Sequence, residues 1–273
     1  MAVNYAEKYS SQIDERFKIG SVTNAAVNHN YDFVGVQTVK VYSIPTSAMN
    51  DYKLTGSNRY GEPEELGNEL QEMTMSKDRS FTFTIDRRNY EDTMMTQAAG
   101  QALQRQIDEV IIPEIDVYRL SVMAANAGVI SDPLAVTENN AYKCFLNATS
   151  SFIENKVPTA GTVAYVTPAY LTALKQDDTF IKAGDLSQQM LIKGQVGEVD
   201  RIPIVTVPST YLPENVAFML TNPIATTSPI KLAEYKTHDN PPGINGWLVE
   251  GRVYYDAFVL NNKKKAIYVH KTA

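Results

Sequence analysis

The chain has 273 residues, of which 44% are hydrophobic and 21% are charged, as in an ordinary soluble globular protein. Its formal net charge of -6 disfavours broad electrostatic binding to nucleic acid or to an anionic membrane. A single cysteine, Cys144, excludes an intrachain disulfide, and neither a secretory signal pattern nor a stretch of about 18 apolar residues is found. We therefore expect a soluble protein made in a cytoplasm, with two subdomains and an extension.

The first thirty residues predict a short helix followed by an arm. Residues 20–32 are small and polar, which is typical of a connecting segment. A short helix with so sparse an apolar stripe needs a partner, either its own body or a neighbouring subunit. The predicted helix covers residues 3–18, stops at Gly20, and carries Tyr5, Tyr9, Ile13 and Phe17 at four-residue steps.

Two strands are expected on either side of a long polar segment. Residues 33–44 are rich in β-branched side chains, and residues 80–85 alternate between aromatic or aliphatic residues and threonine. Residues 46–78, between them, offer little with which to build a core. A loop of this length is unusual inside a compact domain, so we expect a two-stranded projection that rests on a neighbour.

Residues 61–72 are acidic, with five glutamates and neither lysine nor arginine. One interpretation is a solvated acidic face. The other is docking on a basic surface of an adjacent subunit, such as one that includes Arg87 and Arg88. The glutamates are Glu62, Glu64, Glu65, Glu69 and Glu72.

A long helix is predicted from about Asp92 to Gly128. Asp92 or Thr93 can cap its start, and Gly128 can end it in a left-handed turn. Because a proline within a helix bends or breaks it, Pro113 predicts a kink or break near residues 109–113. We expect a half-exposed first part and a second part buried in the core. The apolar stripe of the first part comprises Met95, Ala99, Ala102, Leu103, Ile107, Val110 and Ile111.

Helices and strands alternate from about residue 135 to residue 222, which predicts one α/β subdomain. A helix capped by Asn139 or Asn140 carries an apolar face at Ala141, Phe145, Ala148 and Phe152. Thr167 and Pro168 predict the start of another helix. Strands are expected at 161–166, 202–207 and 216–220, with Pro203 placing the second near an edge, and residues 176–198 predict an exposed lobe.

The remaining residues predict returning strands at 230–236, 247–250, 252–260 and 266–270. Asn261 and Asn262, with the lysines 263–265 that follow, predict a turn in a last hairpin. A weak phosphate contact is the alternative for these lysines.

No catalytic, cofactor-binding or metal-binding residues are assigned. The sequence has neither a phosphate-binding glycine loop nor a zinc-type His-Glu-x-x-His motif. Its three histidines lie far apart, and we expect each on the surface or at the end of a strand. Cys144 is predicted to be a small core residue. The acidic pairs 64–65 and 177–178 are expected in loops, where no closed site would shift their pKa values.

Two segments resemble stretches that recur in tailed-phage major capsid proteins of the HK97-like fold. The first is GQVGEVDRIPIVTVPS, residues 194–209, and the second is NPPGINGWLVEGRVYYDAFVLNNK, residues 240–263, which is followed by AIYVH at 266–270. The order of the predicted parts agrees along nearly the whole chain. The resemblance implies an α+β fold with an N-terminal arm, an extended β-hairpin loop, a spine helix in a peripheral subdomain and an α/β axial subdomain.

Carried onto this chain, the resemblance implies five segments. They are an arm (1–32), an extended loop (33–86), a peripheral subdomain with the spine helix (87–134), an axial subdomain (135–222) and returning peripheral strands (223–273).

The resemblance also implies the partners of the chain. These are copies of itself in hexamers and pentamers, a separate scaffolding protein, possible portal and decoration proteins, and packaged double-stranded DNA held without sequence-specific binding. A virion shell assembled in a bacterial cytoplasm is thus the leading hypothesis, and no membrane is involved. The alternatives are an encapsulin-like compartment and, from another class, a soluble hydrolase with an unrecognised site.

Overall fold

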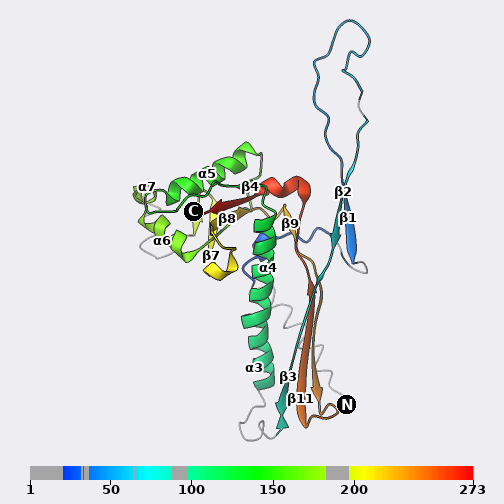
Figure 1. Ribbon diagram of the computed structural model, residues 1–273, viewed down its shortest axis with the longest axis vertical. Coiled ribbons are helices and arrows are strands. Elements are labelled where there is room, and N and C mark those ends of the chain that lie inside the picture. The colour runs from blue at the N-terminus through cyan, green and yellow to red at the C-terminus, as the bar shows by residue number, and fades with distance from the viewer. Residues whose placement is uncertain are drawn as a thin grey trace.

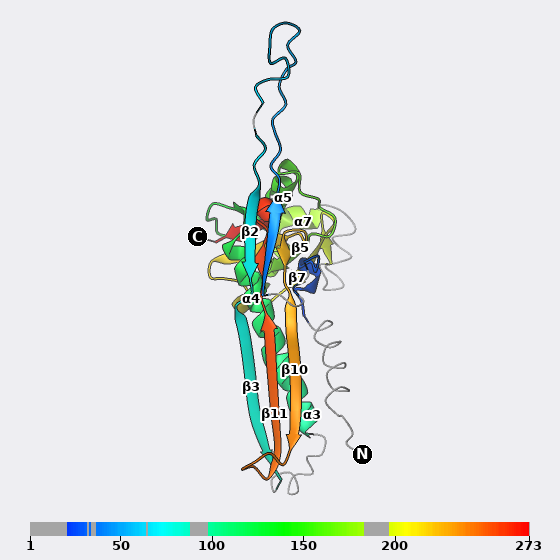
Figure 2. The same ribbon diagram turned by 90° about the vertical axis from the view of Figure 1, so that its right-hand side faces the viewer.

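The computed structural model describes residues 21–31, 33, 37–63, 65–87, 98–182 and 197–272. The helix predicted at 3–18, the caps at Asp92 and Thr93, and Arg88 lie outside these ranges. One long helix runs through the middle of an α+β fold (Figure 1). An α/β lobe lies at one end of this helix, a three-stranded sheet follows its length, and a hairpin projects beyond the body (Figures 1 and 2).

The lobe is built on a six-stranded mixed sheet covered by helices. Apolar side chains of helix α5 (Ala141–Glu154) and of α6 (Pro168–Gln176) pack on one face with Phe180 of α7 (Asp178–Lys182). The sheet has the order β4-β13-β8-β5-β7-β6, in which β13–β4 and β5–β7 are parallel and the other pairs are antiparallel. Its strands are β4 (Val129–Ile130), β13 (Ile267–Lys271), β8 (Val216–Thr221), β5 (Val163–Val166), β7 (Ile202–Thr206) and β6 (Glu198–Val199).

Local sequence patterns predicted most features of this lobe correctly. The four predicted core residues of α5 are all buried, and the Thr167 hydroxyl accepts a hydrogen bond from the Tyr170 amide at 3.3 Å, as a cap should. Pro203 is the second residue of β7, whose outer neighbour is only the two-residue β6. Asn140 does occupy the N-cap position of α5, but its side chain bonds Ala135 and Thr137 of the preceding turn and leaves the helix uncapped.

The three-stranded sheet has the order β10-β11-β3 and is antiparallel throughout. The strands predicted at 247–250 and at the start of 252–260 are one continuous strand, followed by the short β12 (Phe258–Val259). Gly251 permits this continuity, because a Cβ atom there would lie 2.1 Å from the Phe81 ring. The strands are β10 (Ile230–Asp239), β11 (Gly246–Tyr255) and β3 (Lys77–Asp86).

The projecting hairpin consists of β1 (Thr38–Ser43) and β2 (Glu69–Thr74), with residues 44–68 extending beyond them (Figures 1 and 2). Register runs from Thr38 opposite Thr74 to Ser43 opposite Glu69. The projection is as predicted, but the strand at residues 80–85 does not flank it. That strand is part of β3 and pairs with β11, since its Phe81 and Phe83 pack toward the spine helix.

The end of the chain differs from the predicted hairpin. Residues Asn261–Ala266 form a 3-10 helix, and β13 pairs with β8 and β4 in the six-stranded sheet rather than with the preceding strand. The last strand, which was expected among the peripheral strands 223–273, therefore pairs with a strand of the segment 135–222 that was expected to be the axial subdomain. The lysines 263–265 sit in the connection between the two sheets.

The long helix is continuous along the described residues, with a π-helical turn inside it (Figure 1). Helix α3 (Ala98–Gln106) leads into the π turn Ile107–Ile111 and then into α4 (Ile112–Ala125). The expected irregularity is thus present beside Pro113, as a π turn and not as a break. Because this turn holds an extra residue, Val110 is pushed outward and is 45% exposed, although periodicity placed it on the buried stripe.

Gly128 does not end the helix in a left-handed turn. The C-cap is Asn126, and Gly128 is not among the residues with positive φ. A Cβ atom at this glycine would lie 2.4 Å from the backbone carbon of Lys264, and its amide donates to the Lys264 carbonyl at 2.8 Å. A glycine at this position therefore allows the two backbone segments to approach each other closely.

Residues 21–27 are embedded in the body and are not merely an arm. Thr23, Ala26 and Val27 are buried, and Asn24–Ala26 form a 3-10 turn. The Ser21 and Thr23 hydroxyls each donate to Oδ1 of Asp116 at 2.5 Å. This segment is polar because it satisfies a buried carboxylate of the spine helix.

His270 is buried near the end of β13, whereas His29 and His238 are exposed. Its ring stacks on Phe218 at 4.9 Å, and Nε2 lies 3.3 Å from the Leu134 carbonyl. Nδ1 has no hydrogen-bond partner among the described residues. Burial lowers the pKa of His270, and the Leu134 carbonyl offsets part of that effect.

Replacing Gly128 by alanine should destabilise the unassembled chain by about 1–3 kcal/mol, because the added methyl group meets backbone that cannot rotate away. The urea midpoint of unfolding measures this. The matched control is Gly197→Ala, since no described residue lies within 4 Å of a Cβ atom there. Equal midpoints for the two variants would contradict the assigned role of Gly128.

Acidification should destabilise the chain through His270. Its pKa is lower in the folded state than in the unfolded state, so its contribution to stability is complete above about pH 6.5 and is lost as the pH falls toward the folded value. The urea midpoint should therefore fall between about pH 7.5 and pH 5.5. His270→Leu should flatten this slope, and His29→Gln, at an exposed position, should leave it as in the parent. An unchanged slope in His270→Leu would refute the assignment.

Candidate assembly surfaces

Within the described ranges, no group of three or more histidine, cysteine or acidic side chains is arranged to hold a metal ion. None of the helices described is both long and apolar enough to cross a bilayer. Cys144 is buried in the core of the lobe, where burial raises the pKa of its thiol, so the expectation of a structural cysteine is confirmed.

Asp177 lies in the connection between α6 and α7, in a loop as expected, but it is not open to solvent. It is buried between α6 and α7, and its carboxylate accepts hydrogen bonds from the amides of Tyr142 and Thr179, both at 2.9 Å. Burial acts to raise the pKa of Asp177, but the bonds from Thr179 and from backbone amides outweigh it and lower the value. The group therefore ties α7 to the start of α5. Asp178 and Glu65 are exposed, and Glu64 lies outside the described residues.

The hairpin carries an unusual amount of exposed apolar surface. Of fifteen large hydrophobic side chains that are exposed in the described residues, eight lie between Tyr42 and Leu70. Met49 is 98% exposed and Tyr60 is 84% exposed. Many exposed apolar side chains on a single element indicate a candidate interaction site. We call this set the extension surface: Tyr42, Ile44, Met49, Tyr52, Leu54, Tyr60, Leu66 and Leu70.

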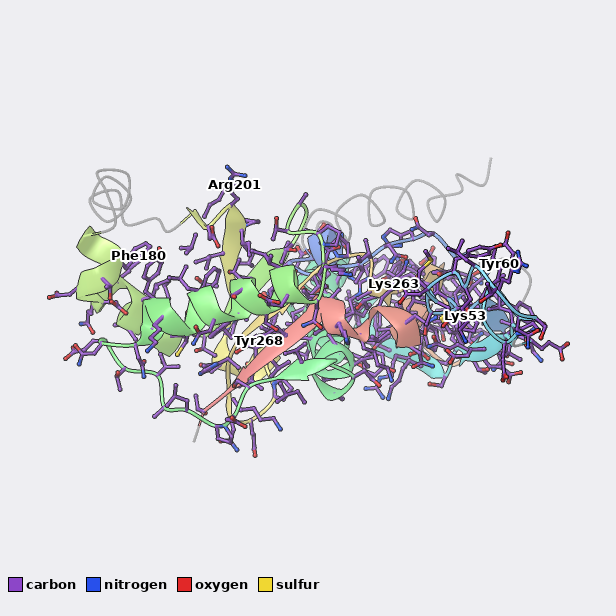
Figure 3. The ribbon with its side chains drawn as sticks, turned by 90° about the horizontal axis from the view of Figure 1, so that it is seen from above. Lys53, Tyr60, Phe180, Arg201, Lys263 and Tyr268 are labelled. Carbon is purple, nitrogen blue, oxygen red and sulfur yellow. The ribbon has the colours of Figure 1, made fainter. Side chains whose placement is uncertain are left out.

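The tip of the hairpin is closed by its own contacts. The Lys53 amide donates to the Arg59 carbonyl at 2.9 Å, and the Tyr52 and Tyr60 rings meet edge to face at 5.0 Å. Seen from above, Lys53 and Tyr60 lie at the opposite end of the molecule from Phe180 of α7 (Figure 3). The extension surface is therefore presented as a formed loop, far from the lobe.

The acidic stretch keeps both of its interpretations. Glu62, Glu65, Glu69 and Glu72 are exposed. Glu72 lies 2.7 Å from Lys40 on the paired strand, and its hydrogen bond raises the pKa of Lys40. Of the proposed basic counterpart, Arg87 contacts Asp239, Asn240 and the Trp247 ring of its own chain. Docking on a neighbour stays a prediction.

The base of the hairpin is fixed to the body by an apolar cluster. Met73 and Met75 are fully buried and pack with Phe33 and Leu260. From the sequence, residues 46–78 were expected to offer little with which to build a core, so these buried methionines were not predicted. They anchor the hairpin on the segment between β11 and β13.

Polar contacts at the same junction were also missed. Asp256 is buried, and its carboxylate accepts bonds from the Ser76 amide at 2.7 Å and from the Tyr118 hydroxyl at 2.7 Å. The Gln71 side chain bonds the backbone of Val259 and Asn261. No short-range pattern could reveal these contacts, since their partners are more than 130 residues apart.

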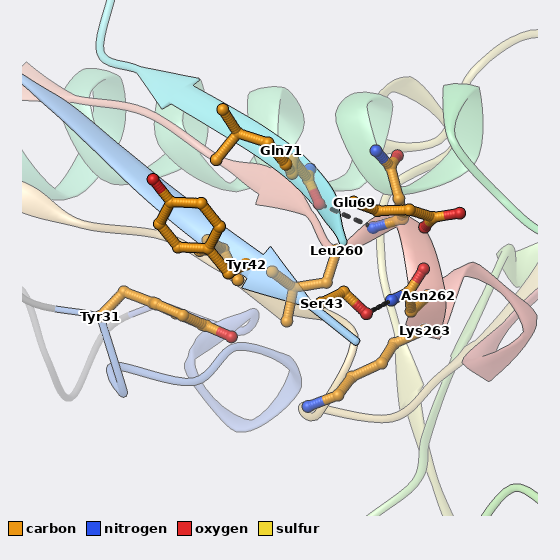
Figure 4. A pocket seen from close by; sticks show the side chains of 11 residues that line it. Tyr31, Tyr42, Ser43, Glu69, Gln71, Leu260, Asn262 and Lys263 are labelled. Carbon is orange, nitrogen blue, oxygen red and sulfur yellow. Dashed lines mark hydrogen bonds between the residues drawn. The ribbon is translucent and has the colours of Figure 1, made fainter. Parts of the chain in front are cut away.

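Next to this junction lies a depression of about 180 Å³ (Figure 4). Tyr31, Tyr42, Leu70 and Leu260 form its apolar walls, and Glu69 and Lys263 carry charge at its rim. The lysines predicted to form a turn thus border the hairpin base, through Lys263.

No family model and no curated protein sequence matches the chain. Solved structures do match along most of its length. A structure from Mycobacterium phage Che8 has 16% identity and a TM-score of 0.70, covering 92% of this chain and 90% of that chain. The capsid structure of cyanophage P-SCSP1u has 12% identity and a TM-score of 0.69, covering 87% of this chain and 84% of that chain.

A virus-like particle from Pyrococcus furiosus has 11% identity and a TM-score of 0.59, covering 98% of this chain and 100% of that chain. At such identities the likeness establishes the fold. The chain therefore has the α+β, HK97-like fold that it shares with phage capsid structures.

Proposed function

We propose that the chain is the major capsid protein of a tailed bacteriophage, which assembles with copies of itself into an icosahedral shell around double-stranded DNA. The observation that carries the proposal is the extension surface, eight large apolar side chains on a hairpin that leaves the body. The shared fold with phage capsid structures supports it.

The energetics favour a neighbour as the partner of this surface. Burying one exposed Met, Leu or Tyr side chain is worth about 1.5–3 kcal/mol. A projecting hairpin cannot bury these side chains against its own body, but the body of an adjacent copy can cover them. In a closed shell every copy makes and receives the same contact, so the gain is repeated around the assembly.

Within such a shell, we assign the segments as the resemblance implies: arm 1–32, extended loop 33–86, peripheral subdomain 87–134 and 223–273, and axial subdomain 135–222. In this assignment, the pairing of β3 with β11 joins the extended loop to the peripheral subdomain, and the pairing of β13 with β8 joins the peripheral to the axial subdomain. A separate scaffolding protein, portal and decoration proteins, and assembly in a bacterial cytoplasm belong to the same proposal.

An encapsulin-like compartment is the second candidate, because the Pyrococcus furiosus virus-like particle matches over its whole length. The contents of particles isolated from the native source separate the two candidates, since nucleic acid favours the phage shell and an enclosed enzyme favours the compartment. No specific observation in the described ranges favours a hydrolase. Three carboxyl groups there have shifted pKa values, and in each the hydrogen-bond partners lower the pKa. These groups are Asp78, Glu109 and Asp177.

Purified protein should form closed particles, with or without a scaffolding protein, in negative-stain electron micrographs. Light scattering that reports only monomers under all these conditions would contradict the proposal.

Deleting residues 46–66 should abolish particles while leaving the unassembled chain folded. The deletion removes five of the eight side chains of the extension surface (Met49, Tyr52, Leu54, Tyr60 and Leu66) and spares the buried Met73 and Met75. It leaves a four-residue connection between Ser43 and Glu69, which hairpins tolerate. We expect the free energy of unfolding to change by no more than about 0.5 kcal/mol, as is usual for surface changes.

A subtler variant tests the apolar side chains directly. Met49→Ser, Leu54→Ser and Tyr60→Ser together should also prevent particles, because the loop then loses the area it would bury. The matched control is Thr55→Ala with Ser57→Ala, two exposed polar positions on the same loop. Particles from the triple serine variant that equal those of the control would show that the extension surface does not drive assembly.

A further inference from the structure

The two hairpin strands pair only with each other among the described strands. A two-stranded ribbon is marginally stable alone and twists freely about its base. Its direction relative to the body must therefore come from contacts at the junction. These contacts fall into two sets, one at Met75 and Ser76 just beyond the end of β2 and one at Gln71 within β2.

The inner set lies at the foot of the hairpin. The Ser76 amide and hydroxyl donate to Oδ2 of Asp256 at 2.7 Å and 3.1 Å, and the Tyr254 hydroxyl donates to the Met75 carbonyl at 3.0 Å. Together with the buried methionines, these bonds hold one end of the hairpin. If the hairpin were attached only there, it could still tilt about that point.

The outer set lies further along the strands. Gln71 Nε2 donates to the Val259 carbonyl, and Gln71 Oε1 accepts from the Asn261 amide, both at 2.9 Å; the second of these bonds is drawn in Figure 4. The amide side chain thus bonds the end of β12 as a neighbouring strand would. On the other hairpin strand, the Ser43 hydroxyl accepts a bond from Asn262 Nδ2. We call Gln71 and Asn262 the outer latch.

Gln71 and Ser76 are five residues apart, which is about 16 Å in an extended strand. Two attachments at that spacing fix a direction, because the hairpin cannot tilt about one without breaking the other. We infer that the outer latch sets the angle at which the extension surface is presented to the next copy. Gln71 and Asn262 are then positioning residues for assembly. This inference rests on the proposed shell function.

The latch can be tested without assembly. Spin labels at Thr55→Cys on the tip and Ser150→Cys on α5 occupy exposed positions, and the native Cys144 is buried. The distance distribution between the labels, measured by pulsed electron paramagnetic resonance on the unassembled chain, should be narrow in the parent. In the Gln71→Met, Asn262→Ala variant it should widen at least twofold.

The control pair is Thr46→Ala with Ser47→Ala, at exposed polar positions on the same hairpin. It should keep the narrow distribution. A latch variant with the parent's thermal midpoint and the parent's distribution width would overturn the inference. If the latch variant has a lower thermal midpoint than the parent, the measurement is repeated with Gln71→Met alone, which is a smaller perturbation. The thermal midpoint and the distribution width of that variant then test the inference in the same way.

Assembly gives the second readout. The parent and the control should form particles of one diameter, whereas the latch variant should form particles of several diameters or open sheets. A parent that never assembles counts against the proposed function, while the label distances still judge the latch. Particles of one parental diameter from the latch variant would show that the angle is set elsewhere.

Discussion

The fold depends on a charged pair enclosed inside it, Arg119 and Asp116 of the spine helix. Arg119 is 0% exposed, and its Nη1 bonds Ser21, Thr23 and Asn24, while Nε donates to Ser228 at 2.8 Å. Taking charges out of water is costly, and removing one partner of such a pair costs several kcal/mol. The pair therefore enforces the placement of every segment that supplies a bond.

From this pair a polar chain reaches the hairpin. The Ser228 hydroxyl accepts from Arg119 and donates to the Asp256 carbonyl at 2.8 Å. The side chain of Asp256 then bonds Ser76, where the hairpin begins. Four separate apolar clusters form the core around this chain. Hydrophobic packing holds each layer together, while directional bonds set how the layers meet.

Periodicity and capping patterns were enough to locate elements whose signals are local, such as the buried face of α5 and the Thr167 cap. They failed wherever the cause lies far along the chain. Gly128 was predicted to end the helix, yet its role is set by the nearby Lys264 backbone, and residues 80–85 pair with residues 247–252 of β11. The latch at Gln71 left no trace in the sequence, because a single glutamine in a polar stretch has no periodicity.

The π turn at Ile107–Ile111 gives the spine helix a change of phase. A turn with one additional residue rotates everything after it by about 100° relative to an uninterrupted α-helix. Leu103 and Ile107 before and within the turn, and Ile115 after it, pack with the three-stranded sheet, whereas Leu120 and Met123 further along pack with the six-stranded sheet. The helix thus behaves as two α-helical frames offset by a single inserted residue. The second frame packs on the three-stranded sheet at its start and on the six-stranded sheet toward its end, so the shifted phase lets one helix contact both sheets.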